Sequence, residues 1–474
     1  MRIFLLLFIA LLVLMLAGCD SQVGGPLPVL ELDVLPPQDV PPVVDMGEIV
    51  SADPRGGTDV TMIRVLIGTS GFASRVHERV YVTSDGDFMV WTKVGEPVQQ
   101  MRAGEVFEIR RAADLLGHEQ LVFAPHHADA RLEIVGLRRN WPDGRTPQYR
   151  GVLEVSATAG GFLVINELPL EEYLYAVVPS EMPSGWGLEA SMVQAITARS
   201  FAYRQFYENR FRAYGAHIDD SVISQVYNNL PETDTAREAV RATRGMVLTY
   251  NGQVIVANYF SASGGTTANA GEVWSAGGVF PGESPPFLRA RAQFEPGFAT
   301  GDLRCEENAA AFFRNTDVPA FERDVPWFRW QVRMTAAELN AAVSSTGIGA
   351  LQYLEVLARG EGGNILEMRL IGTRGEHRVQ TEFNIRTLLA PRNSPVRLNN
   401  GQTLNGWSMM PSAFFTMDIQ RDALGGLVGV TFYGGGHGHG AGMSQHGARA
   451  LLQRGYTYRE VLAHFYPNTE ITLR

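Results

Sequence analysis

Short apolar runs separated by turn residues make up the chain from residue 62 to about residue 133. The runs cover 62–68, 80–82, 88–91, 106–109 and 121–123. Runs of this length between turn residues are typical of β-strands, and Asp85-Gly86 between the second and third runs predicts a hairpin turn. We therefore predict a small β-rich subdomain over residues 62–148.

From residue 149 onward, the pattern predicts strands that alternate with helices. Apolar runs at 149–156 and 162–166 flank Ala159-Gly160-Gly161 and predict a second hairpin. Longer stretches with helical periodicity follow, one of them over 187–208. The predicted fold class is therefore mixed α+β, with a large body over residues 149–474 and the smaller β-rich subdomain before it.

Several helix boundaries can be predicted from single residues. Pro169 suits the first turn of a helix, which is expected to end before Pro179 because the residue before a proline avoids helical geometry. Ser444 is expected to cap the helix that follows it, and Thr457 with Glu460 matches the capping box of a last helix. These signals place the motifs discussed below on or beside helix ends.

The N-terminal residues predict export and a membrane tether. Arg2 precedes an apolar run over 3–17, which is short for a membrane-spanning helix and typical of a signal-peptide core. The run ends at Leu16-Ala17-Gly18-Cys19, which resembles a bacterial lipobox, so residues 1–18 are predicted to be a lipoprotein signal peptide and Cys19 the lipidation site. The alternative is an ordinary signal peptide, with Cys19 incidental. Prolines and acidic residues over 19–61 predict an extended tether to a protein that faces the periplasm or extracytoplasmic space.

Composition narrows the class of protein further. Hydrophobic residues make up 45% of the chain and charged residues 19%, which excludes wholesale disorder and a polytopic membrane protein. The net charge of −10 argues against a nucleic-acid partner that is bound through a diffuse basic surface. Cys305 is the only cysteine besides Cys19, so acylation of Cys19 would leave no pair for an intrachain disulfide.

Glu181 is the first candidate for chemistry. It stands between Pro179 and Pro183, on backbone that a regular helix or sheet does not easily absorb. Apolar neighbours, Met182 and Trp186 among them, would desolvate its carboxyl and raise its pKa toward that of a general acid. The alternative is that Glu181 caps the next helix or pairs with an arginine.

The helix predicted over 187–208 carries two further candidates. Arg199 and Tyr203 are one turn apart, so both side chains can point into the same groove. An amphipathic helix with a surface arginine explains the same spacing.

A glycine-rich segment with three histidines lies near the C-terminus. Six of the nine residues over 434–442 are glycine, which indicates a close approach of the backbone to another group. A phosphate cradle lacks its Lys-Ser/Thr pair, and a zinc site formed by His437, His439 and His446 lacks a nearby acidic or cysteine ligand. A loop that lines a saccharide or peptide cleft, with histidine and glutamine donors, needs the fewest assumptions.

These segments together resemble the stage II sporulation protein D family, also called SpoIID/LytB. The resemblance is carried by Leu170-Glu171-Glu172-Tyr173-Leu174, by Pro179-Ser180-Glu181-Met182-Pro183 and by the Ala-x-Arg-Ser core around Arg199. It continues in the family's order at Gln225-Val226-Tyr227, Tyr259-Phe260-Ser261-Ala262-Ser263-Gly264-Gly265-Thr266, the glycine-rich segment up to Ala448, and His464-Phe465-Tyr466-Pro467.

The resemblance implies the site residues. The family's catalytic glutamate falls on Glu181. The substrate-binding residues expected from the motif positions and the helix spacing are Arg199, Ser200, Tyr203, Gln225, Tyr227, His437, His439, Ser444 and Gln445. Some relatives bind a metal near the position of Asp219 to Tyr227, but this chain has Ser224 there and no cysteine, so no metal and no cofactor are predicted. His446 stands where a tyrosine is commoner.

The resemblance also implies a function. Peptidoglycan would be the substrate, and the reaction that of a lytic transglycosylase, which cleaves the bond between N-acetylmuramic acid (MurNAc) and N-acetylglucosamine (GlcNAc) with formation of 1,6-anhydroMurNAc. Glycan strands without stem peptides are the expected form of the substrate. The alternative is a non-catalytic, glycan-binding enhancer of a separate N-acetylmuramoyl-L-alanine amidase.

Overall fold

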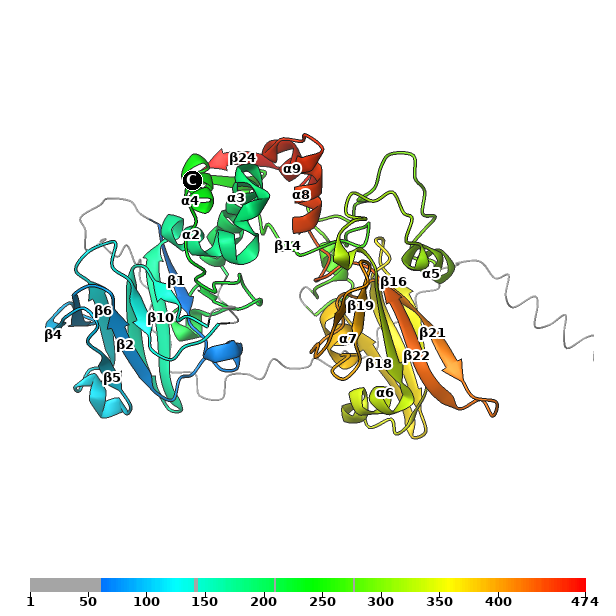
Figure 1. The fold of residues 1–474 in the computed structure, drawn as a ribbon, viewed down its shortest axis with the longest axis horizontal. Coiled ribbons are helices and arrows are strands. Elements are labelled where there is room, and N and C mark those ends of the chain that lie inside the picture. Colours follow the sequence, from blue (N-terminus) through cyan, green and yellow to red (C-terminus); the bar gives the residue numbers. More distant parts are fainter. Residues whose placement is uncertain (1–60, 140–143, 209, 276–277) are drawn as a thin grey trace, which may run out of the picture.

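The computed structural model describes residues 61–139, 144–208, 210–275 and 278–474 (Figure 1). The predicted signal peptide, Cys19 and the predicted tether up to residue 60 lie outside the described residues. Within the described ranges, no helix is both long enough and apolar enough to cross a bilayer.

The N-terminal strands form two sheets. One has seven strands in the order β11-β1-β10-β9-β6-β3-β4, and the other has four in the order β5-β2-β7-β8. The seven strands are β1 (Met62–Leu66), β3 (Phe88–Thr92), β4 (Pro97–Met101), β6 (Gln120–Pro125), β9 (Val152–Thr158), β10 (Gly161–Pro169) and β11 (Ile218–Asp219). The four strands are β2 (Val80–Ser84), β5 (Phe107–Ile109), β7 (Leu132–Ile134) and β8 (Gln148–Tyr149). Alternate side chains of both sheets share one buried cluster, as the period of two along each strand requires.

The hairpin predicted at Asp85-Gly86 is wrong. β2 pairs with β5 and β7, whereas β3 pairs with β4 and β6. The Asp85 N–H donates to Arg131 O at 3.1 Å, and the Arg131 N–H donates to Asp85 Oδ1 at 2.6 Å. These bonds fix the turn beside the start of β7, so the chain crosses from one sheet to the other. The second predicted hairpin is confirmed, since β9 and β10 pair antiparallel.

Helices pack on the β1–β10 side of the larger sheet. α2 (Leu170–Glu181) contacts β1 and β10, and it packs with α3 (Leu188–Gln205) and α4 (Asp234–Ala242) (Figure 1). Their buried faces join the same cluster as the strands. The domain boundary expected after residue 148 falls inside β8, so strands on both sides of it share the N-terminal sheets.

The predicted end of α2 before Pro179 is also wrong, because the helix continues to Glu181. The Met182 N–H donates to Val178 O at 2.9 Å, and the Ser180 hydroxyl donates to Ala176 O at 2.6 Å. The last turn is therefore closed although Pro179 has no N–H to donate.

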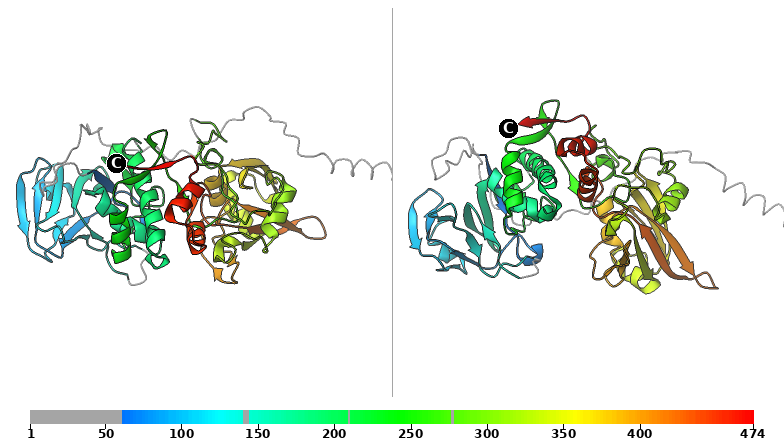
Figure 2. Two further views of the ribbon diagram at one scale, coloured as in Figure 1. Left: turned by 90° about the horizontal axis from the view of Figure 1, so that it is seen from above. Right: turned by 45° about the horizontal axis from the view of Figure 1, so that its top comes forward.

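Residues 278–434 form most of a second lobe, and its two buried clusters also include Ala268, Val273 and Ala441. Its sheets have the orders β20-β19-β15-β22-β21 and β16-β17-β18. The strands are β15 (Trp330–Thr335), β16 (Leu351–Arg359), β17 (Ile365–Gly372), β18 (Gly375–Gln380), β19 (Val396–Leu398), β20 (Thr403–Leu404), β21 (Phe415–Arg421) and β22 (Leu427–Gly434). The helices are α5 (Glu306–Arg314), α6 (Ala336–Ala342) and α7 (Glu382–Leu388). Figures 1 and 2 show this lobe beside the first.

After β22 the chain returns to the first lobe. α8 (Gln445–Gln453) and α9 (Tyr458–Phe465) pack on α3, and β24 (Glu470–Leu473) pairs with β12 (Met246–Tyr250), which also pairs with β13 (Gln253–Val254) (Figures 1 and 2). β14 (Tyr259–Phe260) and β23 (Met443–Ser444) form a short parallel pair. Both predicted caps are confirmed: Ser444 caps α8, and Thr457 with Glu460 forms the capping box of α9. The mixed α+β fold class is confirmed as well.

Candidate active site

Glu181 is the last residue of α2 and is half-buried. The Val226 N–H donates to Glu181 Oε1 at 2.6 Å, and the Tyr259 side chain is a second hydrogen-bond partner of the carboxyl. Burial raises the pKa of Glu181 to about 7, although the bonds from Val226, Tyr259 and Gln445 act in the opposite direction. The carboxyl can therefore hold or release a proton near neutral pH while part of the residue stays exposed.

Tyr259 is held in place by a chain of hydrogen bonds. Gln225 Nε2 donates to Tyr259 Oη at 3.1 Å and to Ala198 O at 3.2 Å, while the Tyr173 hydroxyl donates to Gln225 Oε1 at 3.2 Å. Burial, followed by the charge of Glu181, raises the pKa of Tyr259 well above its usual value. Tyr259 therefore stays protonated and donates its hydroxyl hydrogen to Glu181.

The glycine-rich segment contacts Glu181 directly through Gln445 and indirectly through His439, which contacts Tyr259. Gln445 Nε2 donates to Glu181 O at 3.0 Å, which satisfies a carbonyl at the end of α2. His439 Nε2 lies 2.9 Å from Tyr259 O, and the Ala441 N–H donates to His439 Nδ1 at 3.2 Å, so Nε2 carries the hydrogen. Tyr259 is thus held at its hydroxyl by Gln225 and at its carbonyl by His439.

The glycines themselves are needed for contacts within the chain. The segment bridges to residues 258–268, with Ala262 opposite His437 and Ala268 opposite Ala441. A Cβ on Gly442, whose φ is +80°, would lie 2.1 Å from Asn258 O. The close approach predicted from the composition is therefore made to the β14 segment.

Each histidine of this region lies against a tryptophan. The ring centroids are 4.4 Å apart for His437 and Trp327, which are stacked, 4.9 Å for His439 and Trp274, and 4.7 Å for His446 and Trp186. Trp407 contacts His437 edge-on at 5.3 Å. Burial lowers the pKa of His437 to about 3 and those of His439 and His446 to about 4, so all three are neutral at pH 7. Among the described residues, no group of three or more His, Cys, Asp or Glu side chains is arranged to hold a metal ion.

The other predicted binding residues are placed away from the acid or inside the core. Arg199 is 1% exposed and forms two 2.8 Å bonds with the Glu171 carboxylate, and its neighbour Ser200 donates to Ile196 O at 2.7 Å. Tyr203 packs on Phe206. The positions of these side chains give them a structural role in α3 and do not test whether any of them meets a substrate.

Two further predicted residues are also used internally. The Tyr227 hydroxyl donates to Oδ1 of Asn166, a residue of β10, at 2.9 Å. Ser444 is fully buried, accepts the Gly447 N–H as the cap of α8, and donates to Glu322 Oε2 at 2.9 Å. Of the predicted residues, the structure thus brings Gln225, His439 and Gln445 together with Glu181, and His437 lies next along the segment.

Sequence reasoning missed several members of the site. Tyr259 stands in a motif that carries the family resemblance, but nothing in its local sequence indicated a contact with Glu181. Trp274 also stands in a motif of the family resemblance, Glu272-Val273-Trp274, whereas Trp327 and Trp407 come from other segments, and only the fold gathers the three rings around the histidines. Glu322 gave no sequence signal, because its donors Ser263 and Ser444 are far from it along the chain.

Comparison with known protein families finds matches to two parts of the chain. Residues 158–250, which include Glu181 and Gln225, match the family of the stage II sporulation protein (SpoIID), and residues 275–442 match a domain of unknown function (DUF8618). The segment that carries Glu181 is therefore similar to the SpoIID family, which supports the resemblance of this chain to the SpoIID/LytB family.

Curated relatives cover a similar part of the chain. The amidase enhancer of Bacillus subtilis (strain 168) is 28% identical over 312 residues, which cover 63% of this chain and 40% of the enhancer. Stage II sporulation protein D of the same organism is 26% identical over 323 residues, 65% of this chain and 76% of that protein. Stage II sporulation protein D of Bacillus amyloliquefaciens is also 26% identical, over 65% of this chain and 75% of its own length. The matched region thus spans less than half of the amidase enhancer.

Proposed function

We propose that this protein is a peptidoglycan lytic transglycosylase that cleaves the MurNAc–GlcNAc bond of glycan strands without stem peptides. The observation that carries the proposal is the state of Glu181: a half-buried residue whose carboxyl has a pKa near 7 and is fixed by a backbone N–H and a phenol. A general acid needs this combination, because it must be protonated at the working pH and still be reachable by the substrate.

The reaction needs only one carboxyl group. Protonated Glu181 gives its proton to the glycosidic oxygen as the C1–O bond breaks and an oxocarbenium-like state forms. The resulting carboxylate, stabilised by the Val226 N–H and the Tyr259 hydroxyl, then takes the proton of the muramic C6 hydroxyl. The C6 oxygen attacks C1 and closes the 1,6-anhydro ring, so no external water is consumed.

The contacts of Glu181 agree with this scheme. In the described part of the chain they come from an amide N–H, a phenol and a carboxamide, and none comes from a second carboxylate. Ordinary glycosidases place two carboxyl groups across the bond, one of them to activate water or to form a covalent intermediate. An intramolecular attack by the C6 hydroxyl removes that requirement.

Tryptophan side chains supply surfaces for a sugar chain. Trp186 follows Glu181 in the short helix η3 (Ser184–Trp186), and Trp274, 39% exposed, lies against His439. An indole presents a flat apolar face that suits the C–H face of a pyranose ring, and its N–H can bond a hydroxyl or acetamido group. A neutral histidine lies against each indole, and the Trp186 ring is also contacted by the Arg449 guanidinium, 4.9 Å from its centroid.

A second candidate function is that of a glycan-binding enhancer of a cell-wall amidase. The relative named amidase enhancer favours it, although that relative is matched over only 40% of its length. The tryptophans would serve binding alone equally well. The enhancer function gives no role to a half-buried Glu181 whose carboxyl can hold a proton near neutral pH.

Digestion of purified sacculi tests the proposal. The full chain is incubated with intact and with amidase-treated sacculi, and the soluble products are analysed by mass spectrometry. We expect anhydro-muramic ends from amidase-treated sacculi and none with Glu181→Gln. Equal glycan binding by both proteins without any release would support the enhancer function instead.

We also propose that Cys19 carries the lipid anchor and that the catalytic part works from a membrane surface. The lipobox-like motif and the proline-rich stretch after it support this placement. Cys19→Ser should move the protein to the soluble extracytoplasmic fraction after cell fractionation. Unchanged membrane association of that variant would contradict acylation.

A further inference from the structure

An arginine of α8 lies beside the proposed active site and has no acidic partner within the part of the chain that the structure describes. Arg449 follows Gln445 by four residues, so both project from the same face of the helix. Gln445 contacts the main chain of Glu181, which places Arg449 one helical turn from that contact. Arg449 is half-buried, and among the described residues no carboxylate forms an ion pair with it.

The surroundings of Arg449 form a small recognition surface. Its guanidinium lies over the Trp186 ring at 4.9 Å from the centroid, and the His446 ring lies 4.7 Å from the same indole. His446 Nδ1 is buried and has no hydrogen-bond partner in the described part of the chain. The Arg449 cation, the apolar Trp186 ring and the His446 Nδ1 atom, which has no partner among the described residues, therefore lie together. Trp186 follows Glu181 by five residues in the sequence.

Two more deeply buried arginines of the chain are neutralised by carboxylates, whereas the buried Arg329 bonds only to main-chain carbonyls within the described residues. Arg199 pairs with Glu171 at 2.8 Å, and Arg386 pairs with Glu382 at 2.8 Å. Burying a cation without a partner is costly, so a partly buried arginine usually faces a carboxylate. Arg449 has neither a carboxylate nor a carbonyl partner among the described residues, and it lies where the proposed substrate would lie.

We propose that Arg449, stacked on Trp186, binds the lactyl carboxylate of a muramic acid residue from which the stem peptide has been removed. This inference rests on the proposed function. The lactyl carboxylate is the group that distinguishes strands without stem peptides from strands that carry them. In a strand with stem peptides the lactyl group is an amide and carries no charge, whereas removal of the peptide exposes a carboxylate. A guanidinium whose face is stacked keeps its N–H edges free for a bidentate bond to that carboxylate.

Binding to two chemical forms of one polymer tests the inference. Denuded glycan strands are compared with the same strands after their carboxyl groups have been converted to methylamides. Both are titrated into the full chain carrying Glu181→Gln, so that no cleavage consumes the ligand. We expect about tenfold tighter binding of the carboxylate form, a preference that falls as salt is added.

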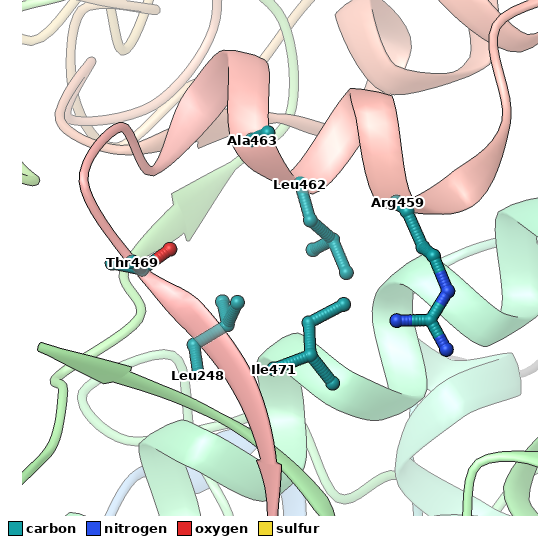
Figure 3. Close-up of a pocket in the computed structure, with 6 residues that line it drawn as sticks. All are labelled: Leu248, Arg459, Leu462, Ala463, Thr469 and Ile471. Carbon is teal, nitrogen blue, oxygen red and sulfur yellow. The ribbon is translucent and has the colours of Figure 1, made fainter. Parts of the chain in front are cut away.

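Variants of Arg449 then test whether this residue causes the preference for the carboxylate form of the polymer. Arg449→Gln in the same background should weaken binding of the carboxylate form about tenfold and leave the methylamide form unchanged, while Arg449→Lys should keep part of the preference. Arg459→Gln is the matched control. Arg459 also lies over an aromatic ring, that of Tyr458 at 5.1 Å, and lines a separate hollow of about 210 Å³ on α9 (Figure 3). That variant should behave as the parent.

Equal binding of both polymer forms by the parent would overturn the inference. So would an equal loss for both forms in Arg449→Gln, because that result indicates a structural role in holding Trp186. Thermal unfolding of each variant identifies misfolding, and Arg449→Lys provides the folded comparison. Because the readout is binding without cleavage, the carboxylate preference can fail while Glu181 is catalytic, and it can hold while Glu181 is not.

Discussion

Glu181 and Glu322 approach the start of α8 from the two lobes, and burial raises the pKa of each to about 7. Glu181 is half-buried and contacts Gln445, whereas Glu322 is 1% exposed and contacts Ser444. Glu322 accepts hydrogen bonds from the Ser263 N–H at 2.9 Å, from the Ser263 hydroxyl at 2.6 Å and from the Ser444 hydroxyl at 2.9 Å.

The difference between the two glutamates is the basis on which we propose that Glu181 is a catalytic acid and Glu322 a structural one. Both carboxyls titrate near neutral pH, so a raised pKa alone does not identify the acid that acts. The acid must also be reachable, and only Glu181 keeps an exposed part. Glu322 joins the second lobe to the β14 segment and to the cap of α8, and its hydrogen-bonding capacity is used within the protein.

The largest effect is expected from exchanging each acid for its amide. Glu181→Gln should lower the rate of anhydro-muropeptide release about a thousandfold, because the amide cannot donate the proton. Glu322→Gln, measured in the same sacculus assay, should stay within about twofold of the parent. A comparable loss of rate in both variants would erase the distinction drawn between them.

The free energy of unfolding should show the opposite order, with a larger loss for a Glu322 variant than for a Glu181 variant. Glu322→Ala removes the acceptor of the buried Ser263 and Ser444 hydroxyls, while the Ser263 N–H keeps Ser444 Oγ at 3.2 Å, and it is expected to lower the free energy of unfolding by about 3 kcal/mol. Glu181→Ala should cost about 1 kcal/mol, because water can reach the half-buried Val226 N–H. Urea denaturation at pH 7 measures both values. A larger loss for Glu181→Ala would contradict the structural role of Glu322.

The pH dependence of stability offers a smaller effect with a fixed sign. The pKa of Glu322 is raised from 4.5 to about 7, so between these values the folded chain holds a proton that the unfolded chain has released. The free energy of unfolding should therefore fall as pH rises from 5 to 7, by about 1 kcal/mol per pH unit from this group. Glu322→Gln should flatten this slope in urea denaturation. A slope that is unchanged, or that rises with pH, would contradict the assignment.

The sequence predicted features set by neighbouring residues better than features set by distant ones. The caps at Ser444 and Thr457 and the pairing of β9 with β10 depend on a few adjacent side chains, and all were predicted correctly. The Asp85-Gly86 turn was misread because Arg131, 46 residues away, supplies its hydrogen bonds. Pro179 was misread because the rest of the last turn of α2 is closed without its N–H.

The candidate site divides in the same way. Glu181 was identified from its prolines, its apolar neighbours and the family resemblance, all of which are local in sequence. Its partner Tyr259 and the donors of Glu322 lie on segments that are distant in sequence. Only the pairing of the β14 segment with the glycine-rich segment brings them together. Arg199 was expected in a groove because helical spacing fixes only the relative directions of side chains, and Glu171, which covers it, lies on another helix.

The smallest effect tests how Glu181 is tuned. The Tyr259 hydroxyl donates to the carboxylate and thereby holds the pKa of Glu181 below the value that burial alone would give. Tyr259→Phe should raise that pKa, so the high-pH limb of kcat/KM, along which the acid loses its proton, should move to higher pH by about half a unit. Tyr173→Phe is the matched control, because Tyr173 bonds to Gln225 and reaches Glu181 only through Gln225 and Tyr259. A shift to lower pH in Tyr259→Phe, or equal shifts in both variants, would show that the phenol does not set the acidity of Glu181, and the contrast with the enclosed Glu322 would then rest on exposure alone.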